Sequence, residues 1–184
     1  MPGTHVALIR GINVGKAKRV AMGDLRDLLA TLGYRDVRSL LNSGNLVFTA
    51  GRAAPVGIAA RIQEAMAERL GVSARVMVLT REMYTTVVEQ NALHARASDA
   101  TRLLVAFCVD GTRLEEMAPL AKKSWKPEAL AIGSHAAYVW CPDGILESAL
   151  LDAVGRTLGD ATTTRNWATV MKVHDALLAE DSGR

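Results

Sequence analysis

The sequence predicts an α+β protein in which one order of strands and helices occurs twice. Short apolar runs rich in β-branched residues alternate with segments whose apolar residues recur at helical spacing. The same order of elements stands on both sides of a polar segment at residues 91–99. The chain has 184 residues, of which 49% are apolar and 22% charged. It can therefore bury a sizeable core, and its composition excludes disorder throughout.

The first 80 residues predict the order β-α-β-β-α-β. The four leucines within residues 25–32 follow the spacing i, i+3, i+4, i+7, which places them on one helix face. Pro55 is suited to open a second helix and Gly71 to close it. This order is that of a ferredoxin-like unit. The predicted elements are strands at 5–10, 37–41, 46–49 and 74–79 and helices at 25–32 and 55–70, with a tight turn at 42–45.

The order recurs after a bridging helix that Thr80 is expected to cap and that extends to about Leu93. A capping box of Thr112 and Glu115 predicts the first helix of the second half. The predicted fold is thus two ferredoxin-like subdomains, at 1–80 and 100–184, plus a bridging helix and linker at 81–99 and a C-terminal helix. The other expected elements are strands at 102–109, 129–132, 136–140 and 161–163 and helices at 146–158 and 167–178.

Positive charge is concentrated in the first half of the chain. The net charge is +3, and residues 1–92 carry 12 Lys and Arg against 7 Asp and Glu. The stretch Arg10–Arg19 holds four cations, Arg10, Lys16, Lys18 and Arg19, and no acid. Such a segment can concentrate and steer anions, so an anionic small molecule or a nucleic acid is the expected partner.

Other partner classes have little support in the sequence. No apolar run reaches the roughly 18 residues of a membrane span, so no membrane is expected. Cys108 and Cys141 lie in strand-like runs and are expected to be buried thiols. No spacing of His, Cys, Asp or Glu predicts a metal, and no cofactor is expected. The start of the chain has no signal-peptide pattern, which favours a cytoplasmic location.

The basic stretch includes glycines that resemble a phosphate loop but do not form one. A Walker A loop has four residues between its glycines and a hydroxyl residue after its lysine. Here three residues separate Gly11 from Gly15, and alanine follows Lys16. The alternatives are a solvated surface loop and a phosphate contact, because loops beyond strand ends collect ligands in α/β folds. Arg10 can fork onto a carboxylate or phosphate, with Asn13 and Lys16 beside it.

Two further polar segments are candidates for the same ligand. Ser43 and Asn45 lie in the hairpin turn, where turn chemistry explains them equally well. The Thr-rich segment before the last helix predicts Thr164 as its cap, with Arg165 and Asn166 beside the exposed N–H groups of the first turn. In the alternative interpretation, Arg165 pairs with an acid and the segment is only structural.

These motifs together resemble the domain of unknown function 1697 family. The resemblance implies an α+β protein of two ferredoxin-like subdomains, mostly bacterial, and it implies no established activity. The residues that carry it are the segment 7–15, then Met22, Leu25–Arg26, Leu32–Gly33, the segment 42–48, the segment 163–167, Thr169–Val170 and Lys172.

We therefore expect a cytoplasmic protein that binds a nucleotide or nucleic acid in a basic cleft between the subdomains. Two function classes remain open. One is an enzyme acting on a phosphorylated or carboxylated small molecule, for which no catalytic residue can be named. The other is a structural protein whose polar motifs only lock the fold. The candidate ligand-binding residues are Arg10, Asn13, Lys16, Ser43, Asn45, Thr164, Arg165 and Asn166.

Overall fold

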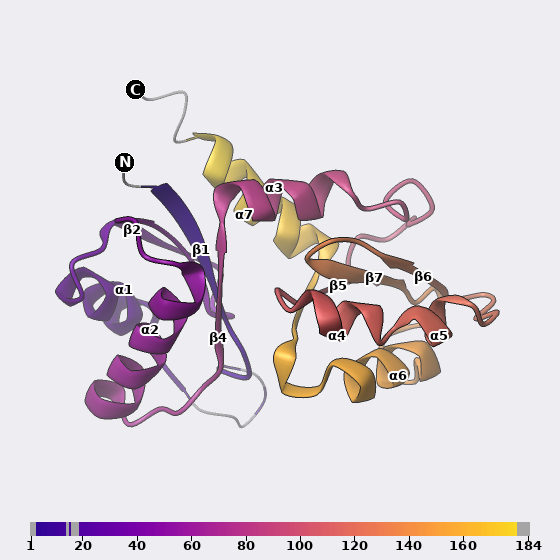
Figure 1. Ribbon diagram of the computed structural model, residues 1–184, viewed down its shortest axis with the longest axis horizontal. Coiled ribbons are helices and arrows are strands. Elements are labelled where there is room, and N and C mark those ends of the chain that lie inside the picture. Colours follow the sequence, from indigo (N-terminus) through magenta and orange to yellow (C-terminus); the bar gives the residue numbers. More distant parts are fainter. Residues whose placement is uncertain (1–2, 14, 16–18, 180–184) are drawn as a thin grey trace. The chain divides into compact units, whose positions relative to one another are not determined.

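The chain is divided into two compact units. The computed structural model describes residues 3–13, 15 and 19–179 (Figure 1). Unit 1 comprises Met1–Tyr84 with Val173–Arg184, and unit 2 comprises Thr85–Lys172. Both boundaries fall inside helices, and the first of them lies within the predicted bridging segment 81–99. Each unit is described by itself below.

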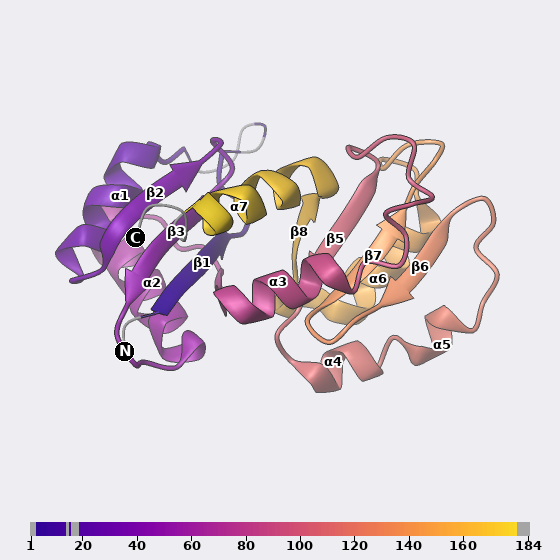
Figure 2. The same cartoon turned by 90° about the horizontal axis from the view of Figure 1, so that it is seen from above.

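Unit 1 contains a four-stranded antiparallel sheet in the order β2-β3-β1-β4. The helices α1 and α2 both cover one face of this sheet (Figures 1 and 2). The first hairpin is formed by β2 and β3, and β4 lies at the edge beyond β1. The elements are β1 (Gly3–Ile9), α1 (Met22–Thr31), β2 (Arg35–Leu40), β3 (Asn45–Ala50), α2 (Pro55–Leu70) and β4 (Val76–Thr80).

The core of unit 1 follows from the alternation of side chains along its strands. Ala7 and Ile9 of β1 and Leu46 and Phe48 of β3 are buried on the helix-covered face, as the twofold period of a strand requires. The helix α2 supplies Ile58, Ile62 and Met66 from one stripe. It begins with Pro55 in its first turn and ends at Gly71, whose φ of 64° is left-handed.

Unit 2 repeats this arrangement with the sheet order β6-β7-β5-β8. This is the order of unit 1 with each strand replaced by its equivalent, so the predicted two ferredoxin-like subdomains are confirmed. The helices α4, α5 and α6 cover one sheet face (Figure 1). The elements are α3 (Arg81–Glu89), which begins in unit 1, β5 (Leu103–Phe107), α4 (Gly111–Glu115), α5 (Ala118–Ala121), β6 (Ala129–Ile132), β7 (Ala136–Trp140), α6 (Ala149–Leu158), β8 (Thr163–Asn166) and α7 (Trp167–Ala179), which ends in unit 1.

The end of α7 is held within unit 1 by two arginines. Arg38 of β2 donates from Nη2 to the carbonyl oxygen of Ala176 at 2.9 Å, and Arg81 donates to that of Leu177. The last carbonyls of a helix have no partner inside the helix and carry its negative dipole end. Cations from two other elements therefore satisfy the end of α7, which has no basic residue in its own last turn.

Two predicted helix starts and one predicted strand in unit 2 are wrong by a few residues. The cap of α4 is Asp110, whose carboxylate accepts from the N–H of Thr112, so Thr112 does not open a capping box. The helix α6 is capped by Ser148 rather than beginning at residue 146, because Leu146 is 93% exposed and lies outside the apolar stripe. The predicted strand at 161–163 is instead β8, and α7 follows it directly at Trp167.

Candidate functional site

The candidate residues are divided between the two units. Arg10, Asn13, Ser43 and Asn45 belong to unit 1, and Thr164–Asn166 belong to unit 2. Lys16 lies outside the described residues. The structure therefore brings the unit 1 candidates together as one group, and the expectation that both groups share one cleft stays a prediction.

Asn13 holds the basic loop to the start of α1 and to the hairpin turn. Its Oδ1 accepts from the N–H of Val20 at 2.8 Å, and its Nδ2 donates to the carbonyl of Val20 at 2.7 Å. The same amide nitrogen donates to the carbonyl of Asn42 at 3.0 Å. Asn13 also adopts a left-handed φ of 56°, a conformation that Asn tolerates better than most residues. Its amide thus clamps two chain segments in position.

The turn that contains Ser43 and Asn45 is packed as well as hydrogen-bonded. Asn45 is fully buried and its Nδ2 donates to the Leu40 carbonyl and to Ser43 Oγ, both at 3.0 Å. Between them, Gly44 has a left-handed φ of 75°, and an added Cβ would lie 2.9 Å from Ile9 Cβ. The carbonyl of Gly44 also accepts from the N–H of Ile9 at 2.8 Å. The turn is therefore locked against the end of β1.

Arg10 is the first residue after β1 and is partly buried. Its backbone N–H donates to the carbonyl of Arg75 at 2.8 Å, which continues the pairing of β1 with β4 by one residue. The strand end thereby fixes the point at which the Arg10 side chain leaves the sheet. Arg10 and Asn13 are therefore anchored on either side of Gly11 and Ile12.

A hollow of about 540 Å³ adjoins this loop at the start of α1. Its described lining residues are Asn13, Arg19, Asn42 and the segment 20–22. The N-cap of α1 is Ala21, and no side chain caps the helix there. The first N–H groups of a helix are suited to bind an anion when no side chain takes them. Asp24 in the first turn offsets part of this positive potential.

Arg19 and Asn42 are site residues that the sequence analysis missed. Arg19 is exposed, and its Nη2 donates to the carbonyl of Gly15 at 3.2 Å, so its guanidinium folds back toward the basic loop. Arg19 stands three residues before α1. A sequence signal existed, because Arg19 is one of the four cations in the acid-free stretch Arg10–Arg19. The contribution of Asn42 comes from its position opposite the loop and has no such signal.

In unit 2, the prediction that Thr164 caps α7 is wrong. The segment forms β8, paired with β5 so that Thr164 lies opposite Ala106. The cap is Asn166, whose Oδ1 accepts from the N–H of Thr169 at 2.9 Å. β-branched threonines fit a strand well, and the pairing with β5 decides the outcome. One of the N–H groups expected to bind an anion is therefore already taken by Asn166.

The Arg165 guanidinium in β8 is held close to its own strand. Its Nη1 donates to Thr163 Oγ1 at 3.2 Å and to the carbonyl of Thr164 at 2.9 Å. Trp167, the first residue of α7, is only partly buried. The stretch 164–167 thus presents polar and aromatic side chains that are not part of the packed interior.

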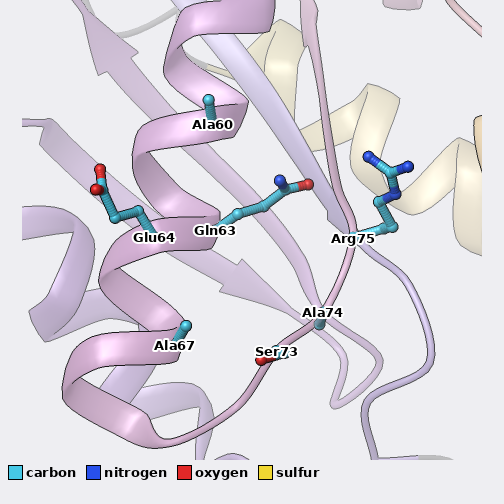
Figure 3. Close-up of a pocket in the computed structure, with 7 residues that line it drawn as sticks. All are labelled: Ala60, Gln63, Glu64, Ala67, Ser73, Ala74 and Arg75. Carbon is cyan, nitrogen blue, oxygen red and sulfur yellow. The ribbon is translucent and has the colours of Figure 1, made fainter.

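Another hollow in unit 1, of about 620 Å³, contains none of the predicted site residues. It lies between α2 and the chain that leads into β4, where Gln63 extends toward Arg75 (Figure 3). Gln63 Oε1 accepts from the N–H of Val76 at 2.8 Å, so that side chain satisfies the edge strand. Glu64 and Arg75 line the hollow with opposite charges.

The structure also bears on the cysteines, metal sites and membrane spans. Cys108 and Cys141 are buried and free, as predicted, and burial raises the pKa of both thiols. Among the described residues, no group of three or more His, Cys, Asp or Glu could hold a metal ion. Within the same residues, no helix has both the length and the apolar character of a membrane span.

These features define an α+β protein of two ferredoxin-like subdomains with a basic loop after its first strand. The chain belongs to the family described as protein of unknown function (DUF1697), whose model matches residues 3–138. One solved structure with this fold is a conserved bacterial protein, SP0830 from Streptococcus pneumoniae, with 24% identity and a TM-score of 0.77. The similarity covers 96% of this chain and 99% of that one. No curated protein matches the chain.

Proposed function

We propose that this is a cytoplasmic protein that binds a phosphate-bearing ligand, a nucleotide or nucleic acid, at the segment Arg10–Arg19. The observation that carries the proposal is the hollow of about 540 Å³ at the start of α1, lined by Arg19 and Asn13. It adjoins a stretch of four cations without an acid. A concave surface lined by one sign of charge raises the local concentration of the opposite ion.

The candidate side chains would have different roles in this site. Arg10 and Arg19 would supply the charge, since a guanidinium can form paired hydrogen bonds with phosphate oxygens. Asn13 would act by holding the loop against α1, because both atoms of its amide already bond with Val20. Asn45 and Ser43 would hold the neighbouring turn in the same way. They are positioning residues rather than direct contacts.

Arg165 is proposed as a second anion contact, carried by unit 2. Its Nη1 bonds with Thr163 Oγ1 and with the carbonyl of Thr164 in β8. A guanidinium can form charge-assisted hydrogen bonds with phosphate oxygens. Arg165 belongs to unit 2, whereas Arg10 and Arg19 belong to unit 1. Arg165 is therefore tested by a variant of its own.

The experiment is titration of Arg10→Ala, Arg19→Ala and Arg165→Ala with nucleotides and short oligonucleotides at two salt concentrations. A charge-assisted hydrogen bond contributes about 1.5–3 kcal/mol, so each variant should bind about 10- to 150-fold more weakly. Arg69→Ala is the control, because that exposed arginine bonds to Thr31 at the other end of α1. Unchanged affinity in all three test variants would refute the proposal.

The salt dependence separates the two ligand types. A nucleic acid releases counterions, so the logarithm of its affinity should fall linearly with the logarithm of salt concentration. A mononucleotide should show a much smaller slope. Either result supports the proposal, since both ligands carry phosphate.

The structural function class is favoured by one specific observation. Asn13 makes three hydrogen bonds within unit 1, which suffice to explain its presence without a ligand. In that case Asn13→Ala would lower the melting temperature, and no member of a nucleotide and oligonucleotide panel would raise that of the wild type. Stabilisation of the wild type by a panel member, lost in Arg19→Ala, would instead support binding.

A further inference from the structure

A third hollow in unit 1 lies at the other end of the sheet from the basic loop. Its volume is about 280 Å³, and it is lined by residues around Tyr34, Gly51 and Arg61. The basic loop follows β1, whereas this hollow adjoins the segment after β3, and the two strands are antiparallel neighbours. The carboxyl ends of two antiparallel neighbours lie at opposite ends of the sheet, so this hollow is separate from the one beside the basic loop.

Two guanidinium groups line this hollow from different parts of the chain. Arg52 lies in the loop after β3, and Arg61 lies in the second turn of α2. None of the described lining residues is acidic. Within the described residues, Arg52 has no hydrogen bond or ion pair and Arg61 has no ion pair. Like charges that share a concave surface repel each other unless an anion lies between them.

Tyr34 forms a fixed wall of the hollow. It is 9% exposed, and its ring centroid lies 5.0 Å from that of Phe48 in the core. The Arg61 guanidinium carbon lies 5.9 Å from the Tyr34 ring centroid, within the range of a cation–π contact. Burial raises the pKa of the Tyr34 hydroxyl, and the nearby Arg61 charge only partly opposes this. The hydroxyl is therefore neutral near pH 7 and can donate a hydrogen bond.

The backbone around the hollow supplies only the partial negative charge of a helix end. The last turn of α1 ends there, and its carbonyls accept from the N–H groups of Gly33 and Tyr34 at 2.9 and 3.2 Å. The first turn of α2 lies on the other side and contains no acidic residue. The full charges that line the hollow are those of Arg52 and Arg61, and both are positive.

We propose that this hollow binds the phosphate group of a small phosphorylated molecule, held between Arg52 and Arg61 with Tyr34 as a hydroxyl donor. A volume of about 280 Å³ is below the range of roughly 300–1,000 Å³ typical of drug-sized ligands. The site thus suits a phosphate with a small substituent and not an extended polymer. Its residues are distinct from those of the proposed site at Arg10–Arg19.

The test is titration of the isotope-labelled protein with inorganic phosphate, followed by amide NMR shifts. We expect saturable shifts in the segment 51–58 that sodium chloride at equal ionic strength does not reproduce. Arg52→Gln should weaken the affinity for phosphate about tenfold or more, since it removes a charge-assisted contact. Arg26→Gln is the matched control, an exposed arginine of the same unit that bonds to Ser39.

Arg19→Ala distinguishes this inference from the proposed function. Phosphate shifts in the segment 51–58 should persist in Arg19→Ala, even if binding at the basic loop is lost. Shifts that do not saturate, that appear equally with chloride, or that are unchanged in Arg52→Gln would overturn the inference. Because Arg52 makes no hydrogen bond or ion pair within the described residues, its replacement is not expected to unfold the protein.

Discussion

Replacing Gly44 by alanine tests how tightly the hairpin turn is packed against β1. The new Cβ would lie 2.9 Å from both Ile9 Cβ and Ile12 Cδ1, and the residue would have to keep a φ of 75°. A left-handed conformation costs a non-glycine residue roughly 1–2 kcal/mol, and overpacking a core costs about 1–3 kcal/mol. We therefore expect Gly44→Ala to lower the free energy of unfolding by about 2–5 kcal/mol.

Gly71→Ala is the matched control for this substitution. Gly71 also has a left-handed φ, of 64°, but an added Cβ there would have no neighbour within 4 Å. Gly71→Ala should therefore lower the free energy of unfolding only by the conformational cost of roughly 1–2 kcal/mol. Urea denaturation of both variants gives the difference, which isolates the contact with Ile9 and Ile12. Equal losses in the two variants would refute the argument that packing makes glycine necessary at position 44.

Three further predictions concern stability and reactivity. Asp110→Ala should lower the free energy of unfolding by about 1 kcal/mol through loss of the α4 cap, while Thr112→Ala should change it little. A larger loss in Thr112→Ala than in Asp110→Ala would show that Thr112 caps the helix instead. Because burial raises the pKa of Tyr138 from 10.0 to about 12, the unfolded state releases this proton first. Stability should therefore fall as pH rises from about 10 to 12, by up to roughly 1.4 kcal/mol per pH unit, and a pH series of denaturation curves in which Tyr138→Phe keeps the full slope would contradict this. Cys108 and Cys141 should react with a thiol reagent far more slowly in the folded protein than in urea, since both are buried with raised pKa values; equal rates would show that they are accessible.

Local signals predicted most of the fold. The helix α2 spans Pro55–Leu70 as predicted, because a proline that suits the first turn and a glycine that suits a left-handed end act within a few residues of the boundaries they set. The hairpin of β6 and β7 also has the predicted bounds, on either side of Gly133. The shared sheet order of the two units then follows from the repeated order of elements.

The errors arise where distant residues decide the structure. Thr164 carries the local pattern of a helix cap, but pairing with β5, almost 60 residues earlier, makes it part of a strand. Arg52 and Arg61 carry no motif, and only the folded chain places both beside Tyr34. The role of Asn13 was likewise hidden, since its bonds reach Val20 and Asn42 across the loop. Side-chain partners that are distant in sequence cannot be predicted from spacing.

The most direct test of the proposed function is a map of amide NMR shifts during titration with a nucleoside triphosphate. Binding at the start of α1 should shift the amides of the segment 19–23 saturably, and Arg19→Ala should abolish those shifts while leaving the protein folded. Shifts confined to other parts of the chain, or shifts in the segment 19–23 that persist in Arg19→Ala, would contradict binding of phosphate at this loop.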